Sequence, residues 1–224
     1  MADIAVFGAG GSVGAAVLAE AAARGHRVTA VVRDPSRFDA ARHGGSAGPG
    51  RVTVLAGDVL DPADVARVAA GQDVLVSAVG GGDGPGHLAL IGPAARALVD
   101  GLRELGGGAP RLIVVGGAGS LETGPGVRVW DAPGLPDGVR QIMHAHGEAL
   151  DHLRTVTDVR WTVLSPAAVL GPGERTGRYR TGLEQLLTDA RGESRISVPD
   201  YALVLVDEIE QPEHIGERFT CCAL

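Results

Sequence analysis

The chain has 224 residues, a net charge of −7, and 45% hydrophobic but only 3% aromatic residues. This length suits one α/β domain. Its core must be built from Val, Leu, Ile and Ala, as in a parallel sheet covered by helices. The acidic balance argues against a nucleic-acid partner, which would favour a basic patch. No run of 18 apolar residues occurs, so no membrane span is expected.

Apolar runs alternate with helical patterns along the chain, which is typical of βαβ units. Strands are predicted at 3–7, 27–32, 51–55, 73–79, 111–115, 160–164 and 217–222. Helices are predicted at 12–24, 61–70, 87–106, 137–156, 178–190 and 199–210. We therefore expect a single α/β domain over residues 1–224, a Rossmann-type doubly wound parallel sheet. Within it, residues 167–195 would form a small C-terminal region on the substrate side.

Irregular stretches separate some of these elements. Residues 42–50 are expected to form a surface loop, whereas 80–86 and 116–136 follow the carboxyl ends of strands. Ligands bind at that edge of an open α/β sheet, so substrate is expected there. The stretch 80–86 contains five glycines, which indicates a mobile lid.

The first strand leads into a glycine turn and then a helical pattern. The spacing is G-x-x-G-x-x-G on Gly8, Gly11 and Gly14, whereas G-x-G-x-x-G would require glycine in place of Val13. Glycine permits positive φ and close approach of a pyrophosphate, and a helix N-terminus offers free N–H groups. This context favours a dinucleotide site over an ordinary strand–helix turn. Its predicted contacts are Gly8, Gly10, Gly11, Ser12, Val13 and Gly14.

The second predicted strand is followed by Arg33-Asp34. NAD-binding folds commonly place an acidic residue at this point, where it bonds the ribose hydroxyls. The Arg33 guanidinium would instead meet the 2′-phosphate of NADP, and Arg37 and Arg42 would add positive charge. The alternative is that Asp34 holds the ribose while Arg33 only solvates the strand end. NADP(H) is therefore expected in preference to NAD(H).

Later strand ends supply further predicted cofactor contacts. Asp58 and Val59 follow the third strand and would contact the edge of the adenine ring. Asp58 could also cap the turn into the next helix, and both roles can hold together. Ala78, Val79 and Gly80 follow the fourth strand and are expected along the cofactor ribose.

These segments together resemble the short-chain dehydrogenase/reductase superfamily. They are most similar to its atypical branch, which includes NAD(P)H-binding proteins related to biliverdin IX beta reductase and flavin reductases. The resemblance runs nearly end to end and rests on residues 7–14, 31–37, 57–60, 114–121 and 161–166. It implies an NAD(P)H-dependent oxidoreductase. It also implies that Pro166 lies in a turn that passes the nicotinamide.

The catalytic signature of the wider superfamily is missing. Most members use Tyr-x-x-x-Lys, but Tyr179 and Tyr201 are followed four residues later by Leu183 and Leu205. The atypical branch often lacks this tyrosine as well. The resemblance therefore implies a reductase that does not use the standard tyrosine acid.

Other side chains are candidates for the chemistry. Ser120 follows the fifth strand, where the resemblance implies a serine that bonds substrate, although Ser120 could instead close the glycine turn before it. His144 occupies a catalytic place implied by the helix pattern, and His146 points to another side of that helix. Either could be an ordinary exposed helix histidine. His87 could lie beside the nicotinamide or simply begin a helix.

No metal site is predicted, because the seven histidines are scattered and the adjacent Cys221 and Cys222 suit reduced packing residues. The expected function is NADPH-dependent hydride transfer to a small planar or carbonyl-bearing molecule, such as a flavin or quinone. Alternatives are a non-catalytic NADP sensor and an epimerase or isomerase. The start of the chain shows no charged leader, so a cytoplasmic location is expected. Apolar helices at 87–106 and 137–156 could pair copies into a homo-oligomer.

Overall fold

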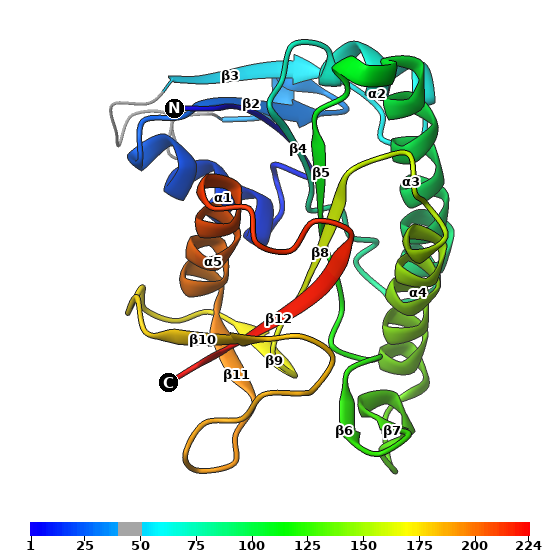
Figure 1. The fold of residues 1–224 in the computed structure, drawn as a ribbon, viewed down its shortest axis with the longest axis vertical. Coiled ribbons are helices and arrows are strands. Elements are labelled where there is room, and N and C mark those ends of the chain that lie inside the picture. The colour runs from blue at the N-terminus through cyan, green and yellow to red at the C-terminus, as the bar shows by residue number, and fades with distance from the viewer. Residues whose placement is uncertain (40–50) are drawn as a thin grey trace.

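An eight-stranded sheet forms the centre of the computed structural model, which describes residues 1–39 and 51–224 (Figure 1). The strands in this sheet are β1 (Asp3–Phe7), β2 (Arg27–Val32), β3 (Arg51–Ala56), β4 (Val74–Ser77), β5 (Arg111–Val115), β8 (Trp161–Ser165), β10 (Tyr179–Gly182) and β12 (Glu217–Ala223). Their order is β10-β12-β8-β5-β4-β1-β2-β3. All neighbouring pairs are parallel except β10 with β12. The predicted Rossmann-type fold is confirmed.

Helices cover both faces of the sheet. They are α1 (Ser12–Ala23), α2 (Pro62–Ala69), α3 (Gly84–Glu104), α4 (Asp137–Arg154) and α5 (Val198–Glu210). Helices α1 and α5 pack together on one face, and α3 and α4 on the other, with α2 against α3 (Figure 1). Within the part of the chain that the structure describes, no helix is both long and apolar enough to cross a bilayer.

Strand β1 shows why the strands of this sheet are continuous apolar runs in the sequence. Ile4 and Val6 pack into the cluster that includes residues of α1 and α5. Ala5 and Phe7 alternate with them and pack into the opposite cluster, with residues of α2 and α3. A strand buried on both faces needs apolar residues at every position.

The topology places a crevice next to β1. The chain leaves β1 for β2 and β3 on one side, and returns to β4 on the other side. The connections from β1 and β4 therefore diverge at their carboxyl ends, which is where doubly wound folds bind nucleotides. The glycine turn and residues 78–80 flank this point.

Most predicted elements are present, with shifted bounds. The strand expected at 73–79 is shorter, at Val74–Ser77. The helix expected at 87–106 begins earlier, at Gly84, because the Asp83 side chain caps it by accepting from the Gly86 amide. The loop expected at 42–50 lies outside the described residues.

The prediction of a helix at 178–190 is wrong. Tyr179–Gly182 instead forms β10, which pairs antiparallel with β12. Farther on, the Glu184 carbonyl accepts from the Glu122 amide at 2.9 Å, and the Leu186 amide donates to the Glu122 carbonyl at 2.8 Å. Backbone groups that a helix would pair internally are thus satisfied by distant partners.

Short elements follow the carboxyl ends of β5 and β8. Residues 167–195 include β9 (Val169–Gly171), which pairs with β11 (Arg195–Ser197). The stretch 116–136 contains a hairpin of β6 (Glu122–Gly124) and β7 (Val127–Arg128). It is therefore more regular than its composition suggested.

Candidate dinucleotide-binding site

The glycine turn after β1 is shaped by contacts that no side chain would permit. Gly8 has φ +78°, and a Cβ there would lie 2.4 Å from the Ala78 carbonyl oxygen. A Cβ on Gly14 would lie 2.2 Å from the Gly8 carbonyl oxygen. A Cβ on Gly10, by contrast, would meet no atom within 4 Å. The turn is therefore pressed against β4 and α1 on its inner side and open on its outer side, as a pyrophosphate cradle requires.

The first turn of α1 completes this cradle. Its N-cap is Gly11, whose amide donates to the Gly8 carbonyl at 3.0 Å, and no side chain caps the helix. The amides of Ser12 and Val13 in the first turn have no intrahelical acceptor. Together with the helix dipole they favour a bound anion.

A cleft of about 1020 Å³ opens in front of the turn and runs across the carboxyl ends of β2, β1 and β4. The predicted cofactor residues that line it are Gly8, Gly10, Gly11, Arg33, Asp58, Val59, Val79 and Gly80. Ser12, Val13, Gly14 and Ala78 are not part of this lining; the first three lie in α1, and Ala78 lies next to Gly8. The residues present thus fit a dinucleotide across the strand ends.

The end of β2 presents guanidinium groups to the cleft. Arg33 and Arg37 both line it, both are exposed, and neither guanidinium has a hydrogen bond or ion pair to another described residue. The neighbouring Asp34 carboxylate is engaged by Ser36, whose amide and hydroxyl donate to it at 3.0 and 2.6 Å. The third predicted cation, Arg42, lies outside the described residues.

Asp58 serves the local backbone and also faces the cleft. Its Oδ1 accepts from the Leu60 amide at 2.9 Å, and its own amide donates to Asp64 at 2.9 Å. These contacts fix the turn into α2 and leave the carboxylate in the cleft lining. The structural and cofactor roles predicted for Asp58 are compatible.

Some lining residues escaped the sequence reasoning. They include Phe38 and Leu60 from the turns after β2 and β3, and Ala89 and Leu90 from α3. Phe38 carried a usable signal, since the chain has only three phenylalanines and this one follows Arg37 directly. The two α3 residues could not be identified as cleft lining from the sequence, because the path of residues 80–86 determines where the start of α3 lies.

Ser120 and Pro166 lie outside the cleft lining. The Arg218 guanidinium donates to the Ser120 hydroxyl at 3.2 Å and to the Ser165 hydroxyl at 3.4 Å. Arg218 is buried on β12 and is also paired with Glu184. Ser120 therefore has a structural partner, and the structure offers no contact that assigns it to a reaction.

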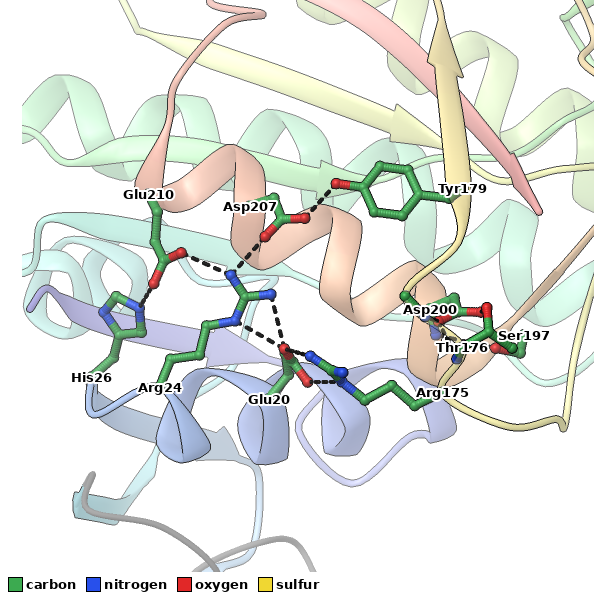
Figure 2. A network of polar contacts seen from close by, with 11 residues as sticks. Glu20, Arg24, His26, Arg175, Thr176, Tyr179, Ser197, Asp200, Asp207 and Glu210 are labelled. Atoms are coloured by element: carbon green, nitrogen blue, oxygen red, sulfur yellow. Dashed lines mark hydrogen bonds and ion pairs between the residues drawn. The ribbon is translucent and has the colours of Figure 1, made fainter. Parts of the chain in front are cut away.

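Neither tyrosine is available as an acid. Figure 2 shows the Tyr179 hydroxyl pointing at Asp207 on α5, to which it donates a hydrogen bond. Burial and this carboxylate raise the pKa of Tyr179. The fully buried Tyr201 hydroxyl donates to the Leu164 carbonyl at 2.6 Å, and burial raises its pKa. All 20 basic residues counted as Lys or Arg are arginines, so no lysine could support a tyrosine anywhere in the chain.

The three candidate histidines divide into two groups. The exposed His144 stacks on Trp130, with ring centroids 4.7 Å apart, and Arg128 also lies over that indole ring. His146, two residues on, instead approaches His87, with ring centroids 5.6 Å apart. His144 is thus part of a surface stack outside the cleft lining, and its predicted catalytic role stays a prediction.

Among the described residues, no three His, Cys, Asp or Glu side chains gather as metal ligands. Cys221 and Cys222 are buried and free. Burial raises the pKa of the Cys221 thiol, so this side chain packs as a small apolar group.

Several solved structures are similar to this chain over nearly its whole length. A candidate exported protein from Burkholderia pseudomallei is 44% identical, with a TM-score of 0.85, over 99% of this chain and 100% of its own. A candidate epimerase from Bacteroides thetaiotaomicron is 36% identical, with a TM-score of 0.84, over 100% and 97%. A candidate NADH-flavin reductase from Streptococcus pneumoniae is 32% identical, with a TM-score of 0.83, over 100% of both.

A family model described as NAD(P)H-binding matches residues 8–212. The match begins at the first glycine of the turn and extends through β8 and α5. It confirms the NAD(P)H-binding part of the resemblance that the sequence showed. The chain therefore belongs to the NAD(P)H-binding family.

Proposed function

We propose that this protein is an NADPH-dependent reductase that transfers hydride to a small planar or carbonyl-bearing acceptor, such as a flavin or a quinone. The observation that carries the choice of NADPH is the pair of guanidinium groups of Arg33 and Arg37 in the cleft lining, which have no protein partners among the described residues. Asp34, the residue that would favour NAD, already accepts from Ser36. Free guanidinium groups at this strand end suit a 2′-phosphate.

The bound cofactor would supply the hydride, and the chain's own residues hold and orient it. The glycine turn and the first turn of α1 would hold the pyrophosphate. Val79 and Gly80, which line the cleft beyond β4, would place the ribose and nicotinamide. Since neither tyrosine can serve as the acid, an acceptor that takes its proton from solvent or from a histidine is favoured. The likeness to a candidate NADH-flavin reductase supports this acceptor class.

The choice of NADPH is tested by Arg33→Ala, with Arg96→Ala as the matched control. Arg96 is an exposed arginine of α3 that does not line the cleft. A charge-assisted hydrogen bond contributes about 1.5–3 kcal/mol, so Arg33→Ala should weaken NADPH binding about 10- to 100-fold and change NADH binding little. Equal losses for both cofactors would remove Arg33 from 2′-phosphate recognition.

A second function is a non-catalytic NADP sensor, favoured by the absence of lysine and of an available tyrosine acid. Purified protein should oxidise NADPH in the presence of FMN or menadione if it is a reductase. Tight NADPH binding without turnover across a broad panel of acceptors would favour the sensor. The likeness to a candidate epimerase makes cofactor-dependent isomerisation a third outcome, seen as product formation without net NADPH oxidation.

The remaining expectations belong to the same proposal. A small molecule would be the partner, and two copies could associate through α3 and α4. A reducing cytoplasmic location suits the free buried Cys221 and Cys222. One similar protein is a candidate exported protein, so fractionation of the native host decides the location. Size-exclusion chromatography with light scattering decides the oligomeric state.

A further inference from the structure

Two histidines from different helices meet beside the end of the cleft at Gly80. His87 lies in the first turn of α3 and His146 lies in the middle of α4, with ring centroids 5.6 Å apart and an angle of 54° between the rings. A Cβ on Gly80 would lie 3.5 Å from Nε2 of His87. Gly80 lines the cleft three residues after β4, so Nε2 of His87 lies next to this end of the cleft.

The neighbours of His87 fix which nitrogen carries its proton. Its Nδ1 lies 2.8 Å from the Asp83 carbonyl oxygen. A carbonyl oxygen can only accept, so Nδ1 donates, and the neutral ring keeps a lone pair on Nε2. The Asp83 carboxylate also accepts from the Gly86 amide at 2.7 Å. The turn before α3 therefore holds the ring in one orientation with Nε2 on the side of Gly80.

His146 limits how much charge this pair can carry. It packs against Gly117, where a Cβ would lie 2.9 Å from the Cβ of His146. Burial, and after it the charge of a protonated His87, lowers the pKa of His146 to about 4. His146 is therefore neutral near pH 7. Among the described residues, Asp83 contacts the His87 ring through its carbonyl oxygen and His146 contacts it through its own ring.

We propose that His87 donates the proton that accompanies hydride transfer, with His146 as its positioning neighbour. This inference rests on the proposed reductase function. The acceptor gains a hydride from the reduced cofactor and a proton from Nε2 of His87, and the cofactor leaves oxidised. The His87 ring is left neutral with its lone pair on Nε2, and water returns the proton. His87 thereby takes the place that the sequence assigned to His144.

The first test requires no turnover. In protein labelled with ¹⁵N-histidine, the neutral His87 ring should show its proton on Nδ1, with signals assigned by His87→Gln. Saturation with NADP⁺ should shift the Nε2 signal of His87, whereas 2′-phospho-ADP-ribose, which lacks nicotinamide, should leave it unchanged. A proton on Nε2 in the neutral ring, or NADP⁺ binding without a response from His87, would overturn the inference. Failure of NADP⁺ to bind would contradict the proposed function as well.

The second test compares histidine variants with NADPH and menadione as substrates. His87→Gln should lower kcat about 100-fold, a usual loss for a general acid, and leave the Kd for NADPH unchanged. Added imidazole should partly restore the activity of His87→Ala. If His87 had only a structural role, added imidazole would not restore it. His144→Gln distinguishes the two assignments. If that variant loses the activity and His87→Gln keeps it, His144 is the acid and the inference is wrong.

Discussion

The close approach of α1 to the glycine turn predicts an unusual response to Gly14→Ala. Alanine normally stabilises a helix by about 1 kcal/mol relative to glycine. Here the new Cβ would lie 2.2 Å from the carbonyl oxygen and 2.8 Å from the carbonyl carbon of Gly8. These two atoms belong to the backbone of Gly8, which lies in a turn with φ +78°. They cannot rotate away as the end of a side chain could.

The two effects can be set against each other. Overpacking costs about 1–3 kcal/mol, and a clash with fixed backbone belongs at the upper end of this range. Subtracting the helical gain leaves a net loss of about 2 kcal/mol. For a chain of this size, each kcal/mol shifts Tm by about 2–4 °C. Gly14→Ala should therefore lower Tm by about 4–8 °C.

Gly138→Ala is the matched control. Gly138 also lies in the first turn of a helix, α4, but a Cβ there would meet no atom within 4 Å. This variant should keep or slightly raise Tm, because only the helical preference changes. Calorimetric melts of both variants under one buffer condition make the comparison. If Gly14→Ala raised Tm as Gly138→Ala does, the packing of α1 on the turn would be refuted.

Two further predictions concern the cradle and the polar network of Figure 2. Gly10→Ala should leave Tm unchanged, because the new Cβ would meet no atom within 4 Å. The same variant should weaken NADPH binding about tenfold or more, which corresponds to about 1.4 kcal/mol. An unchanged affinity in a titration would remove Gly10 from the cradle. Hydrogen bonds from Arg175, followed by those from Arg24, hold the pKa of Glu20 below its ordinary 4.5 (Figure 2). The stabilisation by Glu20 is therefore present above about pH 4.5 and lost as the pH falls through the lowered value. Glu20→Gln should lower Tm at pH 7 and reduce the Tm difference between pH 7 and pH 3, and an unchanged difference would contradict this.

The parts of the fold with local causes could be predicted from the sequence. Strand β1 needed apolar residues on both faces, and the turn after it needed glycine at Gly8 and Gly14. Asp61 and Pro62 begin α2 as a side-chain cap and a first-turn proline. These signals act over a few residues, so a single sequence contains them.

The parts that depended on distant partners could not be predicted. The pattern at 178–190 suggested a helix, but β12 pairs with β10, and Arg218 and Arg154 both bind Glu184. The histidines of α4 show the same limit. The spacing of His144 and His146 predicted that they point to different sides of the helix. That His87 contacts His146 depends on the path of residues 80–86, which the sequence does not give.

The relative affinity of the unmodified protein for NADPH and NADH tests the central claim most directly. Calorimetric titrations of both cofactors, at one pH and one salt concentration, give the two Kd values. NADPH should bind about 10- to 100-fold more tightly than NADH, because the proposed bonds from Arg33 and Arg37 need the 2′-phosphate. Equal Kd values, or tighter binding of NADH, would contradict it.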